Sequence, residues 1–203
     1  MLLQHILDYN EQFVENKEYA PREASKMPRK RMVVVSCMDA RLVELLPKAL
    51  DIHDGDAKII RNAGGKIASA FDSVMQSVIS SVYDLNADEI FLIGHHRCGA
   101  SQTNPRGTLQ KILDRGVASP EILSAIEYAG VDLEKWLFGF DDVCDSTQAN
   151  VDLVRNHPLI PKDVPVHGLV IDPHTGKLDL VVDGYEAMNI VNKELSLQVE
   201  GEL

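Results

Sequence analysis

The sequence is poor in basic residues and contains no long apolar run. Its 203 residues include 20 lysines and arginines against 31 aspartates and glutamates, which gives a formal net charge of -11 at pH 7. This acidic balance argues against a nucleic-acid partner, because proteins that bind nucleic acids usually present a basic face. No stretch approaches the roughly 20 apolar residues that a membrane-spanning helix needs, so we expect no membrane partner either.

Cysteine is scarce as well, and the three residues of this type are Cys37, Cys98 and Cys144. No two of them form a Cys-x-x-Cys pair, which argues against a thioredoxin-like redox site. The first residues alternate apolar and charged side chains and lack the basic start and apolar block of a secretory signal. This combination predicts a cytoplasmic protein whose thiols are free or bound to metal. We expect Cys144, which falls in a helical pattern, to be a small buried residue.

The sequence also lacks the Gly-x-Gly-x-x-Gly pattern of dinucleotide sites and the Gly-Lys-Ser/Thr ending of a P-loop. A single glycine pair, Gly64-Gly65, follows an expected strand. Two consecutive glycines let the backbone turn tightly or approach a ligand closely, but one pair is weak evidence for a phosphate site. A nucleotide-binding function therefore ranks last among the functional hypotheses.

Apolar runs alternate with helical periodicities along the chain, and this alternation indicates the secondary structure. The runs that predict buried strands cover residues 32–35, 57–61, 89–94, 164–172 and 177–183. The patterns that predict helices cover residues 2–15, 42–50, 68–85 and 140–156. The last two strands are close enough in sequence to form a hairpin.

Strands that alternate with helices and finish in a hairpin predict an α/β fold. We expect one domain over residues 1–203, with three αβα layers and a mostly parallel sheet that has one antiparallel edge strand. Residues 1–30 form an N-terminal helix and arm in this interpretation, and the helix packs outside the domain or against a second subunit. Residues 104–136, broken by glycines and a proline, form a helical insertion.

The strand expected at residues 32–35 leads directly into a cluster of reactive side chains. Cys37, Asp39 and Arg41 follow it at alternate positions. If the backbone stays extended, all three point to one side at the carboxyl end of a strand, where ligands bind in open α/β sheets. An arginine beside an acid also keeps the acid ionised. The alternative is that Cys37 is a small core residue and Asp39 caps the next helix.

The strand at residues 89–94 ends in a second cluster, in which His95 and Cys98 are three positions apart. A histidine and a cysteine in such a turn can bind one metal ion, and Cys37 on a neighbouring strand can supply a third ligand. Two thiolates and one imidazole suit Zn²⁺, and three protein ligands leave the fourth position open, as in catalytic zinc sites. Spacing alone leaves His96 as an alternative to His95, because His96 and Cys98 share a side if the turn is extended.

Joined together, these motifs resemble the β-class carbonic anhydrases, in their smaller prokaryotic branch. The matching segments are residues 36–41, 61–64, 94–99, 158–161 and 166–172. The resemblance covers most of the chain from residue 32 to residue 183. It implies reversible hydration of CO₂ to bicarbonate and a proton, with Cys37, His95 and Cys98 as the zinc ligands and a zinc hydroxide as the nucleophile.

The resemblance also implies roles for the residues around the metal. Asp39 would accept a hydrogen bond from the hydroxide, and Arg41 would hold Asp39 away from the zinc. In a closed, inactive form the aspartate becomes the fourth ligand instead. Ala63 and Gly64 would lie beside the substrate pocket. Members of this family are homodimers or larger homo-oligomers, with an N-terminal helix that embraces the neighbouring subunit.

Two positions depart from the family pattern: Arg97 stands where close relatives often carry an acidic or small residue, and Gly65 where many carry asparagine. A cation at position 97 can stabilise hydroxide or bicarbonate, point to water, or indicate a different substrate. One alternative is therefore a hydrolase of CS₂ or carbonyl sulfide on the same scaffold. The other is a non-catalytic zinc protein for assembly or sensing, against which the retention of Asp39 and Arg41 counts.

Overall fold

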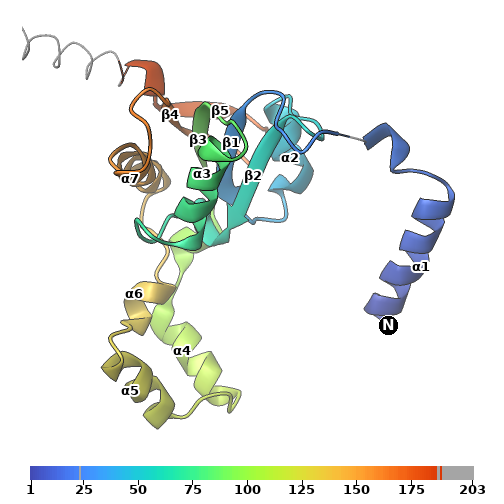
Figure 1. Cartoon of the computed structure of the whole chain (residues 1–203). Coiled ribbons are helices and arrows are strands. Elements are labelled where there is room, and N and C mark those ends of the chain that lie inside the picture. Colours follow the sequence, from blue (N-terminus) through green and yellow to red (C-terminus); the bar gives the residue numbers. More distant parts are fainter. Residues whose placement is uncertain (23, 187, 189–203) are drawn as a thin grey trace, which may run out of the picture.

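The computed structural model describes residues 1–22, 24–186 and 188 of the chain. Within these residues, five strands form one sheet in the order β2-β1-β3-β4-β5 (Figure 1). The strands are β1 (Met32–Cys37), β2 (Ala57–Asn62), β3 (Glu89–His95), β4 (Val166–Ile171) and β5 (Leu178–Val182). Neighbouring strands pair in parallel except β4 and β5, which are antiparallel. The predicted α/β fold with one antiparallel edge strand is therefore confirmed.

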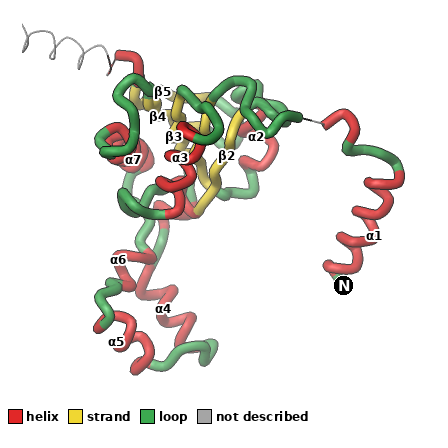
Figure 2. Tube along the Cα trace, viewed as in Figure 1, coloured by secondary structure: helices red, strands yellow, loops and turns green. Residues whose placement is uncertain are grey.

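Helices cover both faces of this sheet, as the tube view in Figure 2 makes visible. The helices α3 (Ser73–Tyr83) and α7 (Val143–Arg155) pack with Val33 and Val35 on one face. The helix α2 (Leu42–Ala49) packs with Val34 on the other face. Because successive strand residues point to opposite faces, a strand covered on both sides needs a continuous apolar run. The run of valines in β1 meets this need, and burying each side chain contributes about 1.5–3 kcal/mol.

Aspartate caps make two helices begin later than their periodicity predicts. The pattern over residues 68–85 becomes helical only at Ser73, because the Asp72 carboxylate accepts a hydrogen bond from the Met75 N–H at 2.8 Å. The pattern over residues 140–156 becomes helical at Val143, where Asp142 caps α7 in the same way. A cap satisfies N–H groups that the first turn leaves unpaired, so it fixes the helix start more sharply than apolar spacing does.

The N-terminal helix α1 (Leu2–Glu15) and the short 3₁₀ helix η1 (Ala20–Arg22) extend away from the sheet (Figure 1). In the part of the chain that the structure describes, α1 buries none of its side chains. The apolar residues Leu2, Leu3, Ile6 and Leu7 are all at least half exposed on its surface.

The insertion expected at residues 104–136 forms three short helices that project below the sheet in the view of Figure 1. They are α4 (Pro105–Asp114), α5 (Pro120–Tyr128) and α6 (Leu133–Leu137). Among residues 1–22, 24–186 and 188, no helix has both the length and the apolar character that crossing a membrane requires.

The strand order places a winding reversal at the centre of the carboxyl edge of the sheet. The chain passes from β1 to β2 on one side and then to β3 on the other side, so the winding direction reverses between β1 and β3. Ligands of open α/β sheets bind in the crevice at such a reversal. Since β1 ends at Cys37 and β3 ends at His95, the sheet delivers both residues to this point.

Candidate metal centre

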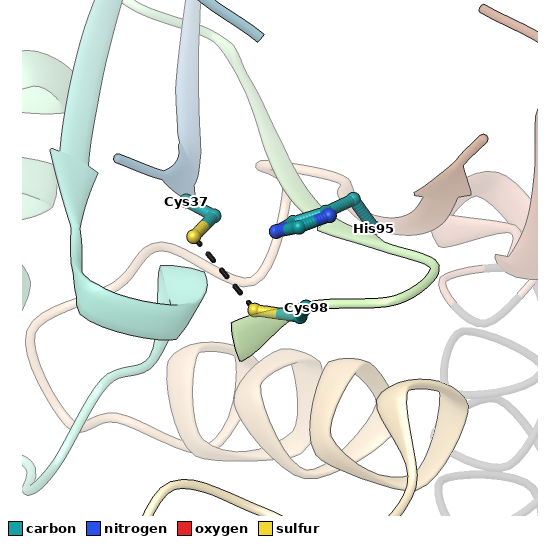
Figure 3. Close-up of side chains that lie close together, drawn as sticks. All are labelled: Cys37, His95 and Cys98. Carbon is teal, nitrogen blue, oxygen red and sulfur yellow. Dashed lines mark hydrogen bonds between the residues drawn. The ribbon is translucent and has the colours of Figure 1, made fainter. Parts of the chain in front are cut away.

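The crevice between β1 and β3 brings together Cys37, His95 and Cys98, whose candidate ligand atoms all lie within 4.8 Å of one another. Cys98 comes from the turn that leads into the 3₁₀ helix η3 (Gly99–Gln102). The three side chains face one another in Figure 3, and their two sulfur atoms are 3.8 Å apart. All three residues are at least 95% buried.

The imidazole of His95 has one nitrogen free to bind a cation. Its Nδ1 lies 3.0 Å from the carbonyl oxygen of His96, to which it donates, so that Nε2 carries the lone pair. This Nε2 is buried and has no hydrogen-bond partner among the described residues. An unpaired buried acceptor is costly, and a metal ion would satisfy it. His96 lies outside the cluster, with its Nε2 3.5 Å from the Asp179 carboxylate, so the geometry favours His95 over His96.

The two thiols share a proton unequally. A hydrogen bond from Cys98, assisted by backbone N–H groups of Asp39 and Gly64, lowers the pKa of Cys37 to about 4. The same contact raises the pKa of Cys98 far above that of a free thiol, because a second thiolate would lie against the first. A divalent cation between the sulfurs removes this conflict.

The donor set fits a tetrahedral metal ion. Bonds of about 2.3 Å from one ion to two sulfurs place the sulfurs about 3.8 Å apart in a tetrahedral site. The observed separation of Cys37 and Cys98 is 3.8 Å. Two sulfurs and one imidazole nitrogen are the ligands that Zn²⁺ accepts most readily in this geometry. The cluster could therefore hold a metal ion with three protein ligands.

Asp39 borders the cluster and is held by Arg41. The guanidinium donates from Nε to Oδ1 at 2.9 Å and from Nη2 to Oδ2 at 2.8 Å, and Oδ2 lies 3.8 Å from Nε2 of His95. These hydrogen bonds keep the pKa of Asp39 far below its ordinary value, so the carboxylate is ionised.

The expectation that Cys37, Asp39 and Arg41 converge because the backbone stays extended is wrong in its reason. The strand β1 ends at Cys37, and Arg41 has helical angles of -67° and -20° immediately before α2. The side chains of Asp39 and Arg41 still meet because a short turn folds the arginine back onto the acid. A backbone hydrogen bond from Arg41 N–H to Oδ1 of Asp39, at 2.9 Å, closes this turn.

Gly65, the last residue of the 3₁₀ helix η2 (Ala63–Gly65), packs directly on the backbone of Cys37. Gly64 and Gly65 have φ angles of 81° and 62°, which residues with side chains rarely adopt. A Cβ atom on Gly65 would also lie 3.0 Å from the Cys37 nitrogen. Gly65 therefore serves close backbone packing beside the site.

Sequence reasoning missed the residue that holds this loop from behind. Asn150 of α7 is 6% exposed, accepts a hydrogen bond from the Ile67 N–H at 3.1 Å, and donates one to the Gly65 carbonyl at 3.1 Å. A signal was present, because Asn150 is a polar residue on the apolar face of a helix, next to Val151 and one turn before Val154. Buried polar side chains at such positions usually satisfy a specific backbone group.

The structure corrects the expectation for Cys144 and gives a role to Arg61. Cys144 is exposed in the first turn of α7, so the expectation that it is buried is wrong. Its place next to the Asp142 cap puts it at the start of the helix, on the side away from the core. Arg61 belongs to one of the matching motifs but had no assigned role. It donates to the carbonyl oxygens of Cys37 and Asp39 at 3.1 and 3.2 Å and so ties β2 to the site turn.

The fold and the cluster define a class of protein, since the winding reversal of an open α/β sheet carries a buried Cys-His-Cys group that could hold a metal ion. A family model described as carbonic anhydrase matches residues 32–178. Because this match covers most of the chain and the solved structures similar to it include β-carbonic anhydrases, the chain belongs to the β-class carbonic anhydrase family of enzymes.

Individual relatives extend this similarity over nearly the whole chain. YtiB of Bacillus subtilis, whose name assigns it provisionally to the carbonic anhydrases, is 50% identical over 184 residues, or 91% of this chain and 98% of the relative. The crystal structure of β-carbonic anhydrase isoform I from Trichomonas vaginalis has a TM-score of 0.82 at 34% identity and covers 91% of this chain and 100% of that one. A carbon disulfide hydrolase of Acidithiobacillus thiooxidans is 31% identical over 175 residues, or 82% of this chain and 85% of the relative.

Replacing Asn150 with alanine should destabilise the loop that backs the site. The substitution leaves the buried Gly65 carbonyl and Ile67 N–H without partners, so we expect a loss of about 1–3 kcal/mol in the free energy of unfolding. Urea denaturation measures this loss, and Gln148→Ala on the same helix is the control. A loss no larger than that of the control would contradict the role of Asn150.

Proposed function

We propose that this protein catalyses the reversible hydration of CO₂ to bicarbonate and a proton at a zinc ion bound by Cys37, His95 and Cys98. One observation carries the proposal: a buried imidazole nitrogen, without a hydrogen-bond partner in the described part of the chain, faces two sulfurs at tetrahedral spacing beside an ionised carboxylate. Membership of the carbonic anhydrase family supports it independently.

Bound zinc would lower the pKa of a water molecule at the fourth position and so supply a nucleophile near neutral pH. The ligands that the chain supplies determine how far that pKa would fall. Two thiolates donate more negative charge to the ion than imidazoles do, so the water is less acidic than in an all-histidine site. We therefore expect the hydration rate to rise on the alkaline side of neutral pH.

Asp39 has the role of orienting the attacking water. Its carboxylate is ionised and fixed by Arg41 on both oxygens, so it can only accept hydrogen bonds. By accepting one from the water, Asp39 would aim the oxygen lone pair at the carbon of CO₂. Arg41 would hold the carboxylate away from a bound ion, and Asp39 would become a fourth ligand only in a closed form.

The substrate pocket that we propose has small, apolar walls near Ala63 and Gly64. A Cβ atom on Gly64 would lie 3.0 Å from that of Ala100 and 3.4 Å from the Phe140 ring. Such walls suit a small molecule without charge. Bicarbonate, the charged product, would depart toward Arg41 and the solvent.

A second candidate reaction is the hydrolysis of CS₂ or carbonyl sulfide. The similarity to a carbon disulfide hydrolase favours keeping it, because these substrates are isoelectronic with CO₂ and can use the same metal ligands. A non-catalytic zinc protein is the third reading. The intact pair of Asp39 and Arg41 counts against it, since a purely structural site has no need of an oriented carboxylate.

Stopped-flow measurement of CO₂ hydration by the zinc-loaded protein tests the proposed reaction. We expect hydration in the unmodified protein and its loss in Cys37→Ala, which removes a ligand. Cys144→Ala is the matched control, because this cysteine is exposed and lies outside the cluster, so the variant should keep full activity.

Sulfide release from CS₂ is measured on the same samples. Sulfide release without CO₂ hydration would replace the anhydrase with the hydrolase. Equal rates in Cys37→Ala and in the unmodified protein, for hydration and for sulfide release alike, would contradict both reactions at this metal centre.

Free thiols and an exposed apolar helix support proposals about the location and the assembly of the protein. Cys37 and Cys98 are unpaired thiols that an oxidising compartment would tend to convert, so we place the protein in the cytoplasm. We further propose that it is a homodimer or a larger homo-oligomer. The exposed apolar side of α1 supports this, because a helix that buries none of its side chains within residues 1–22, 24–186 and 188 gains stability by covering a second copy.

Adding charge to the apolar side of α1 should dissociate the oligomer. We expect Leu3→Glu combined with Ile6→Glu to give monomers in analytical ultracentrifugation, because both side chains are exposed and lie on that side. Gln4→Glu combined with Gln12→Glu adds the same charge to the polar side and should leave the assembly unchanged. Identical sedimentation of the two double variants would contradict the role of α1.

A further inference from the structure

Arg97 lies in the turn between His95 and Cys98 and has a φ of 53°. This left-handed conformation is uncommon for a residue with a side chain and persists only where the surroundings support it. The carbonyl oxygen of Arg97 accepts a hydrogen bond from Nη2 of Arg41 at 3.0 Å. The same Nη2 donates to the Asp39 carboxylate, so Arg41 is anchored both to the acid and to the turn that carries the candidate ligands.

The side chain of Arg97 is engaged on the far side of this turn. Its Nη2 donates to Oδ2 of Asp172 at 3.1 Å. Asp172 is itself fixed, because its Oδ1 accepts the backbone N–H groups of His174 and Thr175 at 2.7 and 3.0 Å. Its own N–H donates to the Lys177 carbonyl at 2.8 Å. The turn between β4 and β5 thus offers a rigid acceptor to the guanidinium of Arg97.

We propose that Asp172 and Arg97 are positioning residues, whose ion pair holds the Arg97 carbonyl where it keeps Arg41 on Asp39. The proposal rests on the proposed function, in which Asp39 must stay off the metal. Oδ2 of Asp39 lies only 3.8 Å from Nε2 of His95, so a carboxylate released by Arg41 has a short path to the ion.

This role assigns a reason to the cation at position 97, which the sequence left open. The Arg97 guanidinium donates to Asp172, whereas Arg41 and Asp39 border the candidate metal ligands. The side chains of Arg97 and Asp172 are 58% and 27% exposed, and such partly exposed pairs add little to global stability. The effect of breaking the pair should therefore appear in the geometry of the metal centre.

Asp172→Asn breaks the pair with the least disturbance, since the amide oxygen still accepts the two turn N–H groups while the charge is gone. Asp179→Asn is the matched control, because it makes the same change of charge on the same hairpin. Asp179 contacts Lys177 and His96 but not the Arg97 side chain. Arg97→Ala removes the pair from the other side.

Azide binding to the cobalt-substituted proteins is the readout. An open metal position binds azide and changes the visible absorption of Co²⁺, whereas an Asp39 carboxylate on the metal blocks that position. We expect Asp172→Asn and Arg97→Ala each to weaken azide binding about tenfold at equal cobalt content. The double variant should lose no more than either single variant, because the two residues act as a unit.

An Asp39→Asn background should abolish the effect of Asp172→Asn, because the blocking carboxylate is then absent. Equal azide affinities in Asp172→Asn, Asp179→Asn and the unmodified protein would overturn the proposal. CO₂ hydration is measured in parallel to separate the two hypotheses. Weakened azide binding with no hydration in the unmodified protein would keep the positioning role and overturn the proposed function. Normal hydration in the unmodified protein, with azide affinity unchanged in Asp172→Asn and Arg97→Ala, would keep the proposed function and overturn the positioning role.

Discussion

Two sulfur atoms held 3.8 Å apart in a buried crevice are the constraint on which the rest of the structure depends. Two thiolates at this separation repel each other, and burial strengthens the repulsion. A metal ion between the sulfurs attracts both thiolates and outweighs their repulsion, but only if the sulfurs and the imidazole are already in place. Strands β1 and β3 lie side by side in the sheet interior and provide that rigidity, because neither can shift without breaking pairing on both of its edges.

Backbone groups around the crevice are fixed by side chains from distant elements. Arg61 holds the carbonyls that follow β1, and Asn150 holds the glycine loop. Arg41 joins the acid to the turn of Cys98. The contacts of Arg61 and Asn150 satisfy polar groups that burial would otherwise leave unpaired, so hydrogen bonds that stabilise the fold also determine the geometry of the site. The scaffold does not by itself determine the substrate. Proteins similar to this chain carry the names of two different enzymes, carbonic anhydrase and carbon disulfide hydrolase.

The parts of this arrangement that local sequence encodes could be predicted. The valine run of β1, the spacing of His95 and Cys98 and the neighbouring Asp39 and Arg41 indicated the sheet and the cluster, because each depends on residues close in sequence. Helix starts were missed where an aspartate cap outweighed apolar periodicity. Contacts across long separations could not be predicted: Asn150 meets Gly65 over 85 positions, and Arg97 meets Asp172 over 75. Only the fold brings such pairs together.

Zinc K-edge X-ray absorption of the zinc-loaded protein tests the central claim most directly. The account predicts two sulfur ligands at about 2.3 Å and one imidazole nitrogen at about 2.0–2.1 Å, with a light atom completing the shell. The imidazole is identified by scattering from the outer atoms of its ring. A shell without sulfur, or one that keeps both sulfurs after Cys37→Ala, would contradict the assignment of the metal centre to the crevice between β1 and β3.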